Sequence, residues 1–548
     1  MTFHYQSVLF RVILEYPTEV FMKLHLTLIA LTVFSASALS QSSEAIRKYT
    51  ENISAGVPTE VKGQLIHSTT LLPEFYFENQ FQRVWTRPLQ ASFLGLVRRA
   101  YEHGLNPADY HFSTINELHA DAVESQSTDA EILFTDAFLL YASHFLNGKL
   151  NPEEVEGEWQ AVRREGNAKS FLKKCLASGN IEAHFRELEP ENVSYHGLLE
   201  ALKKYREIQK NGGWDLFEAG ETLKPQMAGA RVTALKHRLS IEGYFLMEGN
   251  PNDVYTQDLS EAVREFQKHH GLEVDGNVGK QTLASLNIPV SSKIAQIRAN
   301  MERLRWISQD MGAHYVFVNI ADFTMKVYRG DTLSYQQNVV VGKPFRKTPV
   351  FSDLMTYFVL NPYWTVPPTI LFNDVLPEVK KDINYLKVKN MKVLKGSEVV
   401  DPQTIDWSKL SRSNFPYTIR QDPGPTNALG AVKFMFPNKY NIYIHDTPSK
   451  ELFNRPDRAF SSGCIRLNKP MGFVDYLITD IPDWNSEKVD NTLKTGKDKT
   501  VMLKRPINVH ILYLTAWADD SGVQFRNDVY QRDAAVIEAL AESAPTME

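Results

Sequence analysis

The spacing of apolar residues changes near residue 314, and this change constrains the fold more than any other feature of the sequence. Upstream, apolar residues recur every three to four positions in Ala91 to Tyr101 and in Ala130 to Asn147, which predicts helices. Downstream, Tyr315 to Ile320 and Thr324 to Tyr328 alternate with a period of two, which predicts strands. At 548 residues the chain is too long for one ordinary core. We therefore expect a multi-domain α+β protein.

Changes in pattern divide this protein into successive units. Residues 45–225 are expected to form a helical scaffold domain, and residues 226–288 a small three-helix module. We expect residues 310–515 to form a β-rich mixed sandwich with small helices. A charged insertion at about 370–415 interrupts its strands and is interpreted either as a lid or as a solvated face. The tail, 516–548, is expected to be peripheral.

The composition is that of a soluble globular protein, with 43% hydrophobic and 23% charged residues. The formal net charge of −5 is small for this length, so it gives no reason to expect a nucleic acid or an anionic membrane as partner.

One apolar run, Leu24 to Leu39, stands out near the N-terminus. Lys23 precedes it and the small residues Ala36 to Ala38 end it, which is typical of a secretory signal. We expect residues 1–40 to be a signal region with Met22 as the true start, and no stable membrane span after its removal. The alternative is a buried helix.

The two cysteines, Cys175 and Cys464, are too few for a disulfide framework. Cys175 is expected on the buried face of a helix. Cys464 ends a polar Ser461-Ser462-Gly463 loop, and Arg466 follows it. A thiol becomes a strong nucleophile when an imidazole or a positive charge favours the thiolate. The sequence predicts a catalytic Cys464, with the Gly463 and Cys464 amides as oxyanion donors; the alternative is a small buried hydrophobe.

A histidine, His445, ends the predicted strand Asn441 to His445, shortly before the cysteine. Side chains alternate along a strand, so Tyr443 and His445 should share one face and Ile442 and Ile444 the other. We predict His445 as general base and then acid, with Tyr443 beside it in the cleft. The alternatives are a satisfied core histidine and a rim aromatic.

These residues resemble the L,D-transpeptidase (YkuD-type) family, whose signature is a strand histidine followed by Ser/Thr-His-Gly-Cys-x-Arg. His445, Ser461, Gly463, Cys464 and Arg466 match, whereas Ser462 stands where many members have a second histidine. This departure resembles the large, multi-domain branch of the family.

Other segments resemble the same branch. Residues 226–288 are similar to the type 1 peptidoglycan-binding domain, and the insertion is similar to a capping subdomain. Tyr363 and Trp364 lie in a segment similar to the cleft wall, with Trp364 either in the core or in contact with substrate. Arg466 is interpreted either as a ligand for a substrate carboxylate or as a brace for its own loop.

The resemblance implies a peptidoglycan L,D-transpeptidase. Its cysteine would form a thioester with a tetrapeptide stem, release D-Ala, and transfer the acyl group to an amine of a neighbouring stem. The alternatives are an L,D-carboxypeptidase and a non-catalytic cell-wall-binding protein. No phosphate-binding loop and no metal-spaced cluster is convincing, so we expect no cofactor and no metal. Peptide stems of peptidoglycan and other cell-wall synthesis proteins are the expected partners, in the periplasm or cell envelope.

Overall fold

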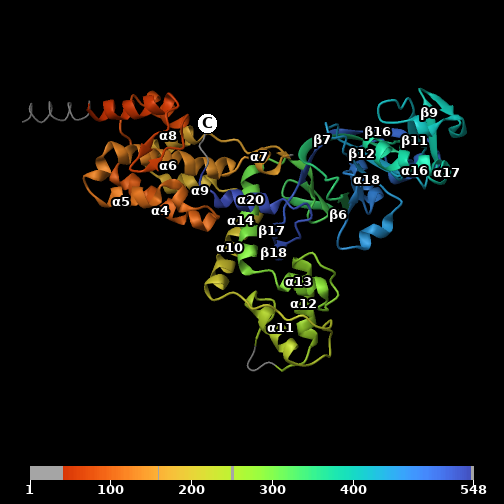
Figure 1. Cartoon of the computed structure of the whole chain (residues 1–548), viewed down its shortest axis with the longest axis horizontal. Coiled ribbons are helices and arrows are strands. Elements are labelled where there is room, and N and C mark those ends of the chain that lie inside the picture. The colour runs from red at the N-terminus through yellow and green to blue at the C-terminus, as the bar shows by residue number, and fades with distance from the viewer. Residues whose placement is uncertain (1–40, 158, 248–251, 545–548) are drawn as a thin grey trace, which may run out of the picture.

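The computed structural model describes residues 41–157, 159–247 and 252–544 (Figure 1). The expected signal region, 1–40, lies outside the described residues. Within them, no helix has both the length and the apolar character needed to cross a bilayer.

The N-terminal helical domain is built around α6, a helix of 20 residues whose side chains are buried along nearly its whole length. A helix that is apolar all round must be covered on every side, and the shorter helices of this domain surround it. Cys175 on α8 is fully buried in this core, as expected. The elements are β1 (Glu60–Val61), β2 (Gln64–Leu65), α3 (Leu71–Glu78), α4 (Arg87–Arg99), η1 (Ala100–His103), η2 (Pro107–Tyr110), α5 (Phe112–Ala120), η3 (Glu124–Gln126), α6 (Thr128–Asn147), α7 (Pro152–Glu156), α8 (Ala168–Ser178), α9 (Ile181–Leu188) and α10 (Val193–Lys210).

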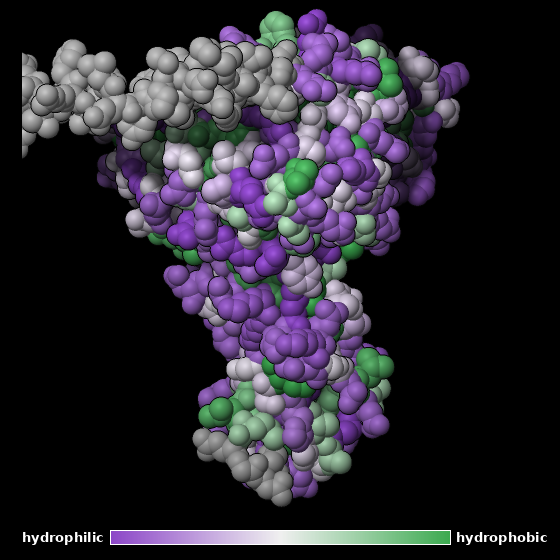
Figure 2. Space-filling view, turned by 90° about the vertical axis from the view of Figure 1, so that its left-hand side faces the viewer, coloured by the Kyte–Doolittle hydropathy of each residue, from purple (hydrophilic) through white to green (hydrophobic). Residues whose placement is uncertain are grey.

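A small lobe with its own apolar core follows, made of α11 (Ala230–Ile241), α12 (Gln257–His269) and α13 (Lys280–Leu286). Phe266 is fully buried in this core. The lobe projects from the body of the molecule, and Figure 2 shows it as the narrow lower part of a surface that is mostly hydrophilic. The long helix α14 (Val290–Trp306) then returns the chain to the body and packs against α10.

Eight strands between His314 and Leu512 form a closed ring, the barrel. The order is β12-β13-β15-β6-β5-β4-β16-β7, and β7 pairs again with β12. The expected mixed β-rich domain is thus present, but its strands close on themselves instead of forming the predicted sandwich. The elements are β3 (Trp159–Gln160), which joins the edge of β7, β4 (His314–Asn319), β5 (Thr324–Arg329), β6 (Thr332–Gly342), β7 (Val350–Leu360), β12 (Val432–Met435), β13 (Ile444–His445), η7 (Lys450–Asn454), β14 (Ala459–Ser461), β15 (Ile465–Leu467), α18 (Pro470–Ile478), α19 (Ser486–Lys494) and β16 (Lys499–Leu512).

The insertion forms a separate cap with a four-stranded sheet of order β10-β9-β11-β8. Its core extends from Trp364 to Leu429, so the cap is longer than the predicted 370–415. The elements are β8 (Trp364–Thr365), α15 (Pro368–Ile370), the π-helix η4 (Leu371–Val375), α16 (Leu376–Lys381), α17 (Asn384–Val388), β9 (Met391–Lys395), β10 (Glu398–Val400), η5 (Pro402–Thr404), η6 (Trp407–Lys409) and β11 (Thr418–Gln421).

The C-terminal tail is not peripheral, contrary to the prediction from its sequence. The hairpin β17 (Ala516–Asp519) and β18 (Gly522–Phe525) packs on α10, and α20 (Asp533–Ala541) packs on α14. The fully buried Arg303 of α14 pairs with Glu156 of α7 at 2.7 Å and with Asp533 at 2.5 Å. A buried charge requires such partners, so this network joins the tail to α14 and to α7 of the helical domain.

Candidate active site

The catalytic residues predicted from the sequence open into one cavity of about 1260 Å³. Its walls come from the barrel, the cap, the loop between β6 and β7, α7 and the C-terminal segment. Of the predicted site residues, Gly463 alone does not line it. The lining includes Tyr363, Trp364, Tyr443, His445, Ser461, Ser462, Cys464 and Arg466.

His445 lies on β13, and its backbone surroundings fix its ring. Asn441 has a φ of +55°, so the strand begins later than the predicted Asn441. Ile444 is fully buried, while Tyr443 and His445 line the cavity, as the alternation predicted. Ile442 lines the cavity as well, contrary to the prediction, because the regular strand begins only at Ile444. His445 Nδ1 donates to the carbonyl oxygen of Asp446, which leaves Nε2 as the acceptor atom of the neutral ring.

Asp446 in turn is held rigidly. Its carboxylate accepts hydrogen bonds from the Ala431 and Thr447 amides and from Lys450 Nζ, at 2.7–2.8 Å. A Cβ at Gly430 would lie 2.2 Å from Asp446 Oδ2, so only glycine permits this approach. The orientation of the His445 ring therefore rests on a well-anchored neighbour.

Three basic side chains stand side by side on neighbouring strands. His445 pairs in register with Lys433 of β12 on one side and with Arg466 of β15 on the other. Burial, followed by Arg466 and the two nearby lysines, lowers the pKa of His445 to about 3. The imidazole is therefore neutral at neutral pH, which is the state that a general base needs.

The loop that carries Cys464 is held by the Ser461 side chain, whose hydroxyl bonds to the Gly463 amide and the Cys464 carbonyl. Gly463 has a φ of +117°, a region that disfavours residues with a Cβ. Its amide donates to Ser461 Oγ at 3.0 Å, so the prediction that this amide faces an oxyanion is wrong. In the described part of the chain the Cys464 amide makes no hydrogen bond, and it remains available as the donor.

The thiol of Cys464 belongs to a half-buried residue that lines the cavity. Burial raises the pKa of Cys464 to about 11, although the Tyr443 amide and hydroxyl and the Arg466 guanidinium each favour the thiolate. The resting thiol is therefore protonated at neutral pH, and attack on a substrate requires that its proton be transferred to a base. His445 is the neutral base in the same cavity.

The remaining predicted residues differ in what they contact. No hydrogen bond to the Arg466 side chain is present among the described residues, and its Nε is buried without a partner. Ser462 Oγ accepts from Arg346 Nη1 at 3.1 Å. Trp364 is 9% exposed and belongs to the cap core as well as to the cavity wall. Tyr363 stacks under the Arg420 guanidinium.

Several cavity residues escaped the sequence analysis: Lys433, Arg346 and, from the tail, Gln531 and Arg532. Only the strand order and the packing of α20 bring them together. Within residues 41–157, 159–247 and 252–544, no group of three potential metal ligands is present.

Comparisons with known proteins define the class of these domains. Residues 313–482 match the family described as "L,D-transpeptidase catalytic domain". Residues 228–286 match "Putative peptidoglycan binding domain", and residues 70–202 match "Scaffold domain". The protein therefore contains a YkuD-type L,D-transpeptidase catalytic domain together with a peptidoglycan-binding domain.

Individual relatives agree with these matches. A protein of Haemophilus influenzae (strain ATCC 51907 / DSM 11121 / KW20 / Rd), named "Putative L,D-transpeptidase", is 34% identical over 268 residues, which are 48% of this chain and 54% of that protein. The chain thus spans about half the length of this curated relative.

Solved structures with weaker similarity include two L,D-transpeptidases. The one from Xylanimonas cellulosilytica is 15% identical and covers 54% of this chain and 99% of its own, with a TM-score of 0.18. The one from Mycobacterium smegmatis is 10% identical and covers 36% of this chain and 58% of its own, with a TM-score of 0.17.

Proposed function

We propose that this protein is a peptidoglycan L,D-transpeptidase in which Cys464 forms a thioester with a tetrapeptide stem. One observation carries the proposal. Cys464 lies directly before β15, which pairs with the strand of His445, and both side chains line one large cavity. A nucleophile and a neutral base on adjacent strands can act on the same carbonyl group.

The first half-reaction would proceed as follows. His445 Nε2 takes the proton of Cys464 Sγ as the sulfur attacks the carbonyl carbon between the L-centre and the terminal D-Ala. The oxygen becomes negative and is stabilised by the Cys464 amide. When the C–N bond breaks, the imidazolium gives its proton to the leaving amine, and D-Ala departs. The nitrogen becomes basic as the C–N bond breaks, so it accepts this proton.

The second half-reaction would use an amine of a neighbouring stem. The amine attacks the thioester carbonyl, a C–N bond forms, the C–S bond breaks, and the proton from nitrogen passes through His445 back to sulfur. Water in place of the amine would give an L,D-carboxypeptidase. The cap forms one wall of the cavity and would limit the access of water to the thioester.

Arg466 is proposed to bind a carboxylate of the stem. A half-buried arginine whose Nε has no hydrogen-bond partner in the described part of the protein suits an anionic ligand, and its planar fork matches a carboxylate. Tyr443, Tyr363 and Trp364 would line the path of the peptide. Peptidoglycan as substrate would place the protein outside the cytoplasm, in the periplasm or cell envelope, with other cell-wall synthesis proteins as neighbours.

The proposal is tested with purified protein and disaccharide-tetrapeptides from peptidoglycan, with the products separated and identified by mass spectrometry. We expect L,D-crosslinked dimers and free D-Ala from the wild type, and neither from Cys464→Ala. Tripeptides without dimers would assign a carboxypeptidase instead. No product at all, from a folded protein, would contradict both activities and favour a wall-binding role.

A further inference from the structure

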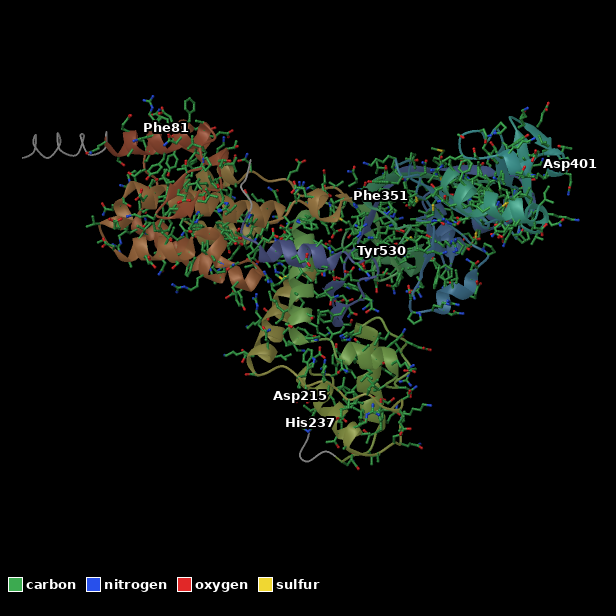
Figure 3. All side chains as sticks on the ribbon, in the orientation of Figure 1. Phe81, Asp215, His237, Phe351, Asp401 and Tyr530 are labelled. Carbon is green, nitrogen blue, oxygen red and sulfur yellow. The ribbon has the colours of Figure 1, made fainter. Side chains whose placement is uncertain are left out.

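We infer that Tyr530, in the C-terminal segment, is a positioning residue of the active site that acts through Thr348 on the Cys464 amide. This inference rests on the proposed function, because it concerns the donor that would stabilise the oxyanion. Tyr530 lies beyond the residues 313–482 that match the catalytic family. Figure 3 places it where the C-terminal segment meets the barrel.

The connection begins at the Tyr530 hydroxyl, which is buried. It donates to the carbonyl oxygen of Gly342 at 2.6 Å and accepts from the Thr348 amide at 3.1 Å. These two groups are the two ends of the loop between β6 and β7. A Cβ at Gly342 would lie 2.2 Å from the carbonyl oxygen of Arg346, so the loop folds back tightly on itself. Tyr530 therefore holds the two ends of this loop together.

Thr348 in turn is hydrogen-bonded to the loop that carries Cys464. The Gly342 amide donates to Thr348 Oγ1 at 2.9 Å, so the hydroxyl proton is free to point elsewhere. The hydroxyl donates to the carbonyl oxygen of Gly463 at 2.7 Å. Thr348 is fully buried, and this bond has no exchange with bulk water. The direction of each hydrogen bond in the chain is thus defined.

The third step follows from the geometry of the peptide bond. The peptide group between Gly463 and Cys464 is planar and trans, so its C=O and N–H point in opposite directions. When Thr348 fixes the carbonyl, it also fixes the direction of the Cys464 N–H. Gly463 has no Cβ to restrict its backbone, so the peptide plane would otherwise rotate easily.

Tyr530 is itself held by several contacts. Its amide donates to Tyr513 Oη at 3.0 Å, and the two rings stack 5.5 Å apart. Tyr513 Oη donates to Asp528, whose carboxylate also accepts from the Arg532 and Asp533 amides. Lys347 Nζ donates to the carbonyl oxygen of Tyr530 at 2.9 Å. Tyr530 is therefore part of the buried network that anchors the tail.

The test compares two reactions of Cys464 in Tyr530→Phe. Acylation by a carbapenem, a strained cyclic amide, passes through an oxyanion, whereas alkylation by iodoacetamide does not. Loss of a whole oxyanion donor costs about 10²–10³ in rate, and we expect its misalignment to slow acylation about 10-fold. The rate of alkylation should stay within about twofold of wild type. Both rates are measured by intact-protein mass spectrometry.

Two further sets of variants control for folding. Tyr141→Phe removes a buried hydroxyl that donates to the carbonyl oxygen of Leu96 in the helical domain, and should leave both rates unchanged. Thr348→Val should slow acylation as Tyr530→Phe does, whereas Thr348→Ser, which keeps the hydroxyl, should restore it. The double variant Tyr530→Phe/Thr348→Val should be no slower than the slower single variant, because both act through one path.

The outcomes separate the inference from the proposed function. Unchanged acylation in Tyr530→Phe, an equal loss in both reactions, or additive effects in the double variant would overturn the role of Tyr530. A wild type that is alkylated but not acylated would overturn the proposed function and, with it, this inference.

Discussion

Cys464 and His445, the proposed nucleophile and base, carry no charge at neutral pH. Burial raises the pKa of the Cys464 thiol to about 11 and lowers that of the His445 imidazole to about 3. A thiolate–imidazolium pair is therefore not the resting state. In the proposed reaction the proton leaves sulfur only as the substrate carbonyl is attacked, and a protonated thiol reacts slowly with other electrophiles at neutral pH.

This protonation state predicts how alkylation of Cys464 depends on pH. In a Cys175→Ala background, which leaves one thiol, the rate of reaction with iodoacetamide should rise continuously from pH 6 to pH 10. The thiolate fraction increases through this whole range when the pKa is near 11. A plateau reached by pH 7 would show a stable thiolate and contradict this reading of the site.

Arg466→Gln tests the role of the free guanidinium. If Arg466 binds the stem carboxylate, KM for the donor stem should rise about 10-fold, the cost of one charge-assisted hydrogen bond, with little change in Tm. Arg466 also lowers the pKa of His445, so the acidic limb of the pH–rate profile should move to higher pH. An unchanged KM together with a large fall in Tm would instead identify a structural brace.

The sequence was enough to propose which residues react, but not to predict which residues hold them in place. A Gly before Cys464 and a strand histidine were sufficient to propose a nucleophile and a base, which the structure places in one cavity. Lys433 and Tyr530 carry no local signal, because their roles depend on strand pairing and on a tail packed against the β6–β7 loop. The engaged Gly463 amide likewise follows from the position of Ser461 Oγ, which no sequence pattern reveals.

Among the elements, the Arg346 side chain links the cap to the loop that carries Cys464. Arg346, on the β6–β7 loop, donates to both carboxylate oxygens of Asp374 in η4 and to Ser462 Oγ. Movement of the cap away from the cavity would break this link. The pairing raises the pKa of Arg346 through its hydrogen bond to Asp374.

Asp374→Asn should loosen this link and admit water to the thioester. A partly exposed ion pair contributes about 0–1 kcal/mol, so we expect the ratio of hydrolysed tripeptide to crosslinked dimer to rise by up to about fivefold. Asp406→Asn, which removes a pair with Lys409 elsewhere in the cap, is the matched control. Equal product ratios in the wild type, Asp374→Asn and Asp406→Asn would show that the Arg346–Asp374 pair does not control which acceptor reaches the thioester.

Prediction from the sequence located the elements better than it placed their boundaries. The charged stretch at 370–415 indicated an insertion, yet its core uses Trp364 and Leu429 from the flanking segments. Period-two strands indicated a β-rich domain, but closure through β7 and β12 depends on a pairing between distant segments. Alternation alone does not distinguish a sandwich from a closed ring.

On the scale of the whole molecule, the peptidoglycan-binding lobe is docked rather than loosely tethered. Its His270 stacks on Phe525 of β18, and Arg526 Nη1 donates to the carbonyl oxygen of His269. The fully buried Lys293 of α14 lies 2.7 Å from His270 Nε2. The tail therefore contacts the lobe at one end and the β6–β7 loop at the other, a connection that its sequence did not indicate.

Lys293 gives this junction a defined pH dependence. Burial lowers the pKa of Lys293 to about 8 from 10.5. Between these values the unfolded chain holds a proton that the folded protein has lost, so the free energy of unfolding increases with pH, by at most about 1.4 kcal/mol per pH unit. Below pH 8 the buried charge destabilises the folded state.

The variant Lys293→Met lacks this titration. The Tm of the wild type, relative to that of the variant, should therefore rise between pH 7.5 and pH 9.5 in thermal melts. Parallel Tm curves across this range would show that Lys293 keeps its proton in the folded protein.

The central claim is that Cys464 carries the acyl group between the two stems. It is tested most directly by mixing the protein with a tetrapeptide stem, quenching in acid, and locating the bound acyl group by peptide mass mapping. We predict a thioester on the peptide that contains Cys464, with the mass of the stem less D-Ala, which disappears when an acceptor amine is added. Crosslinked product formed without such an adduct, or formed by Cys464→Ala, would contradict the account.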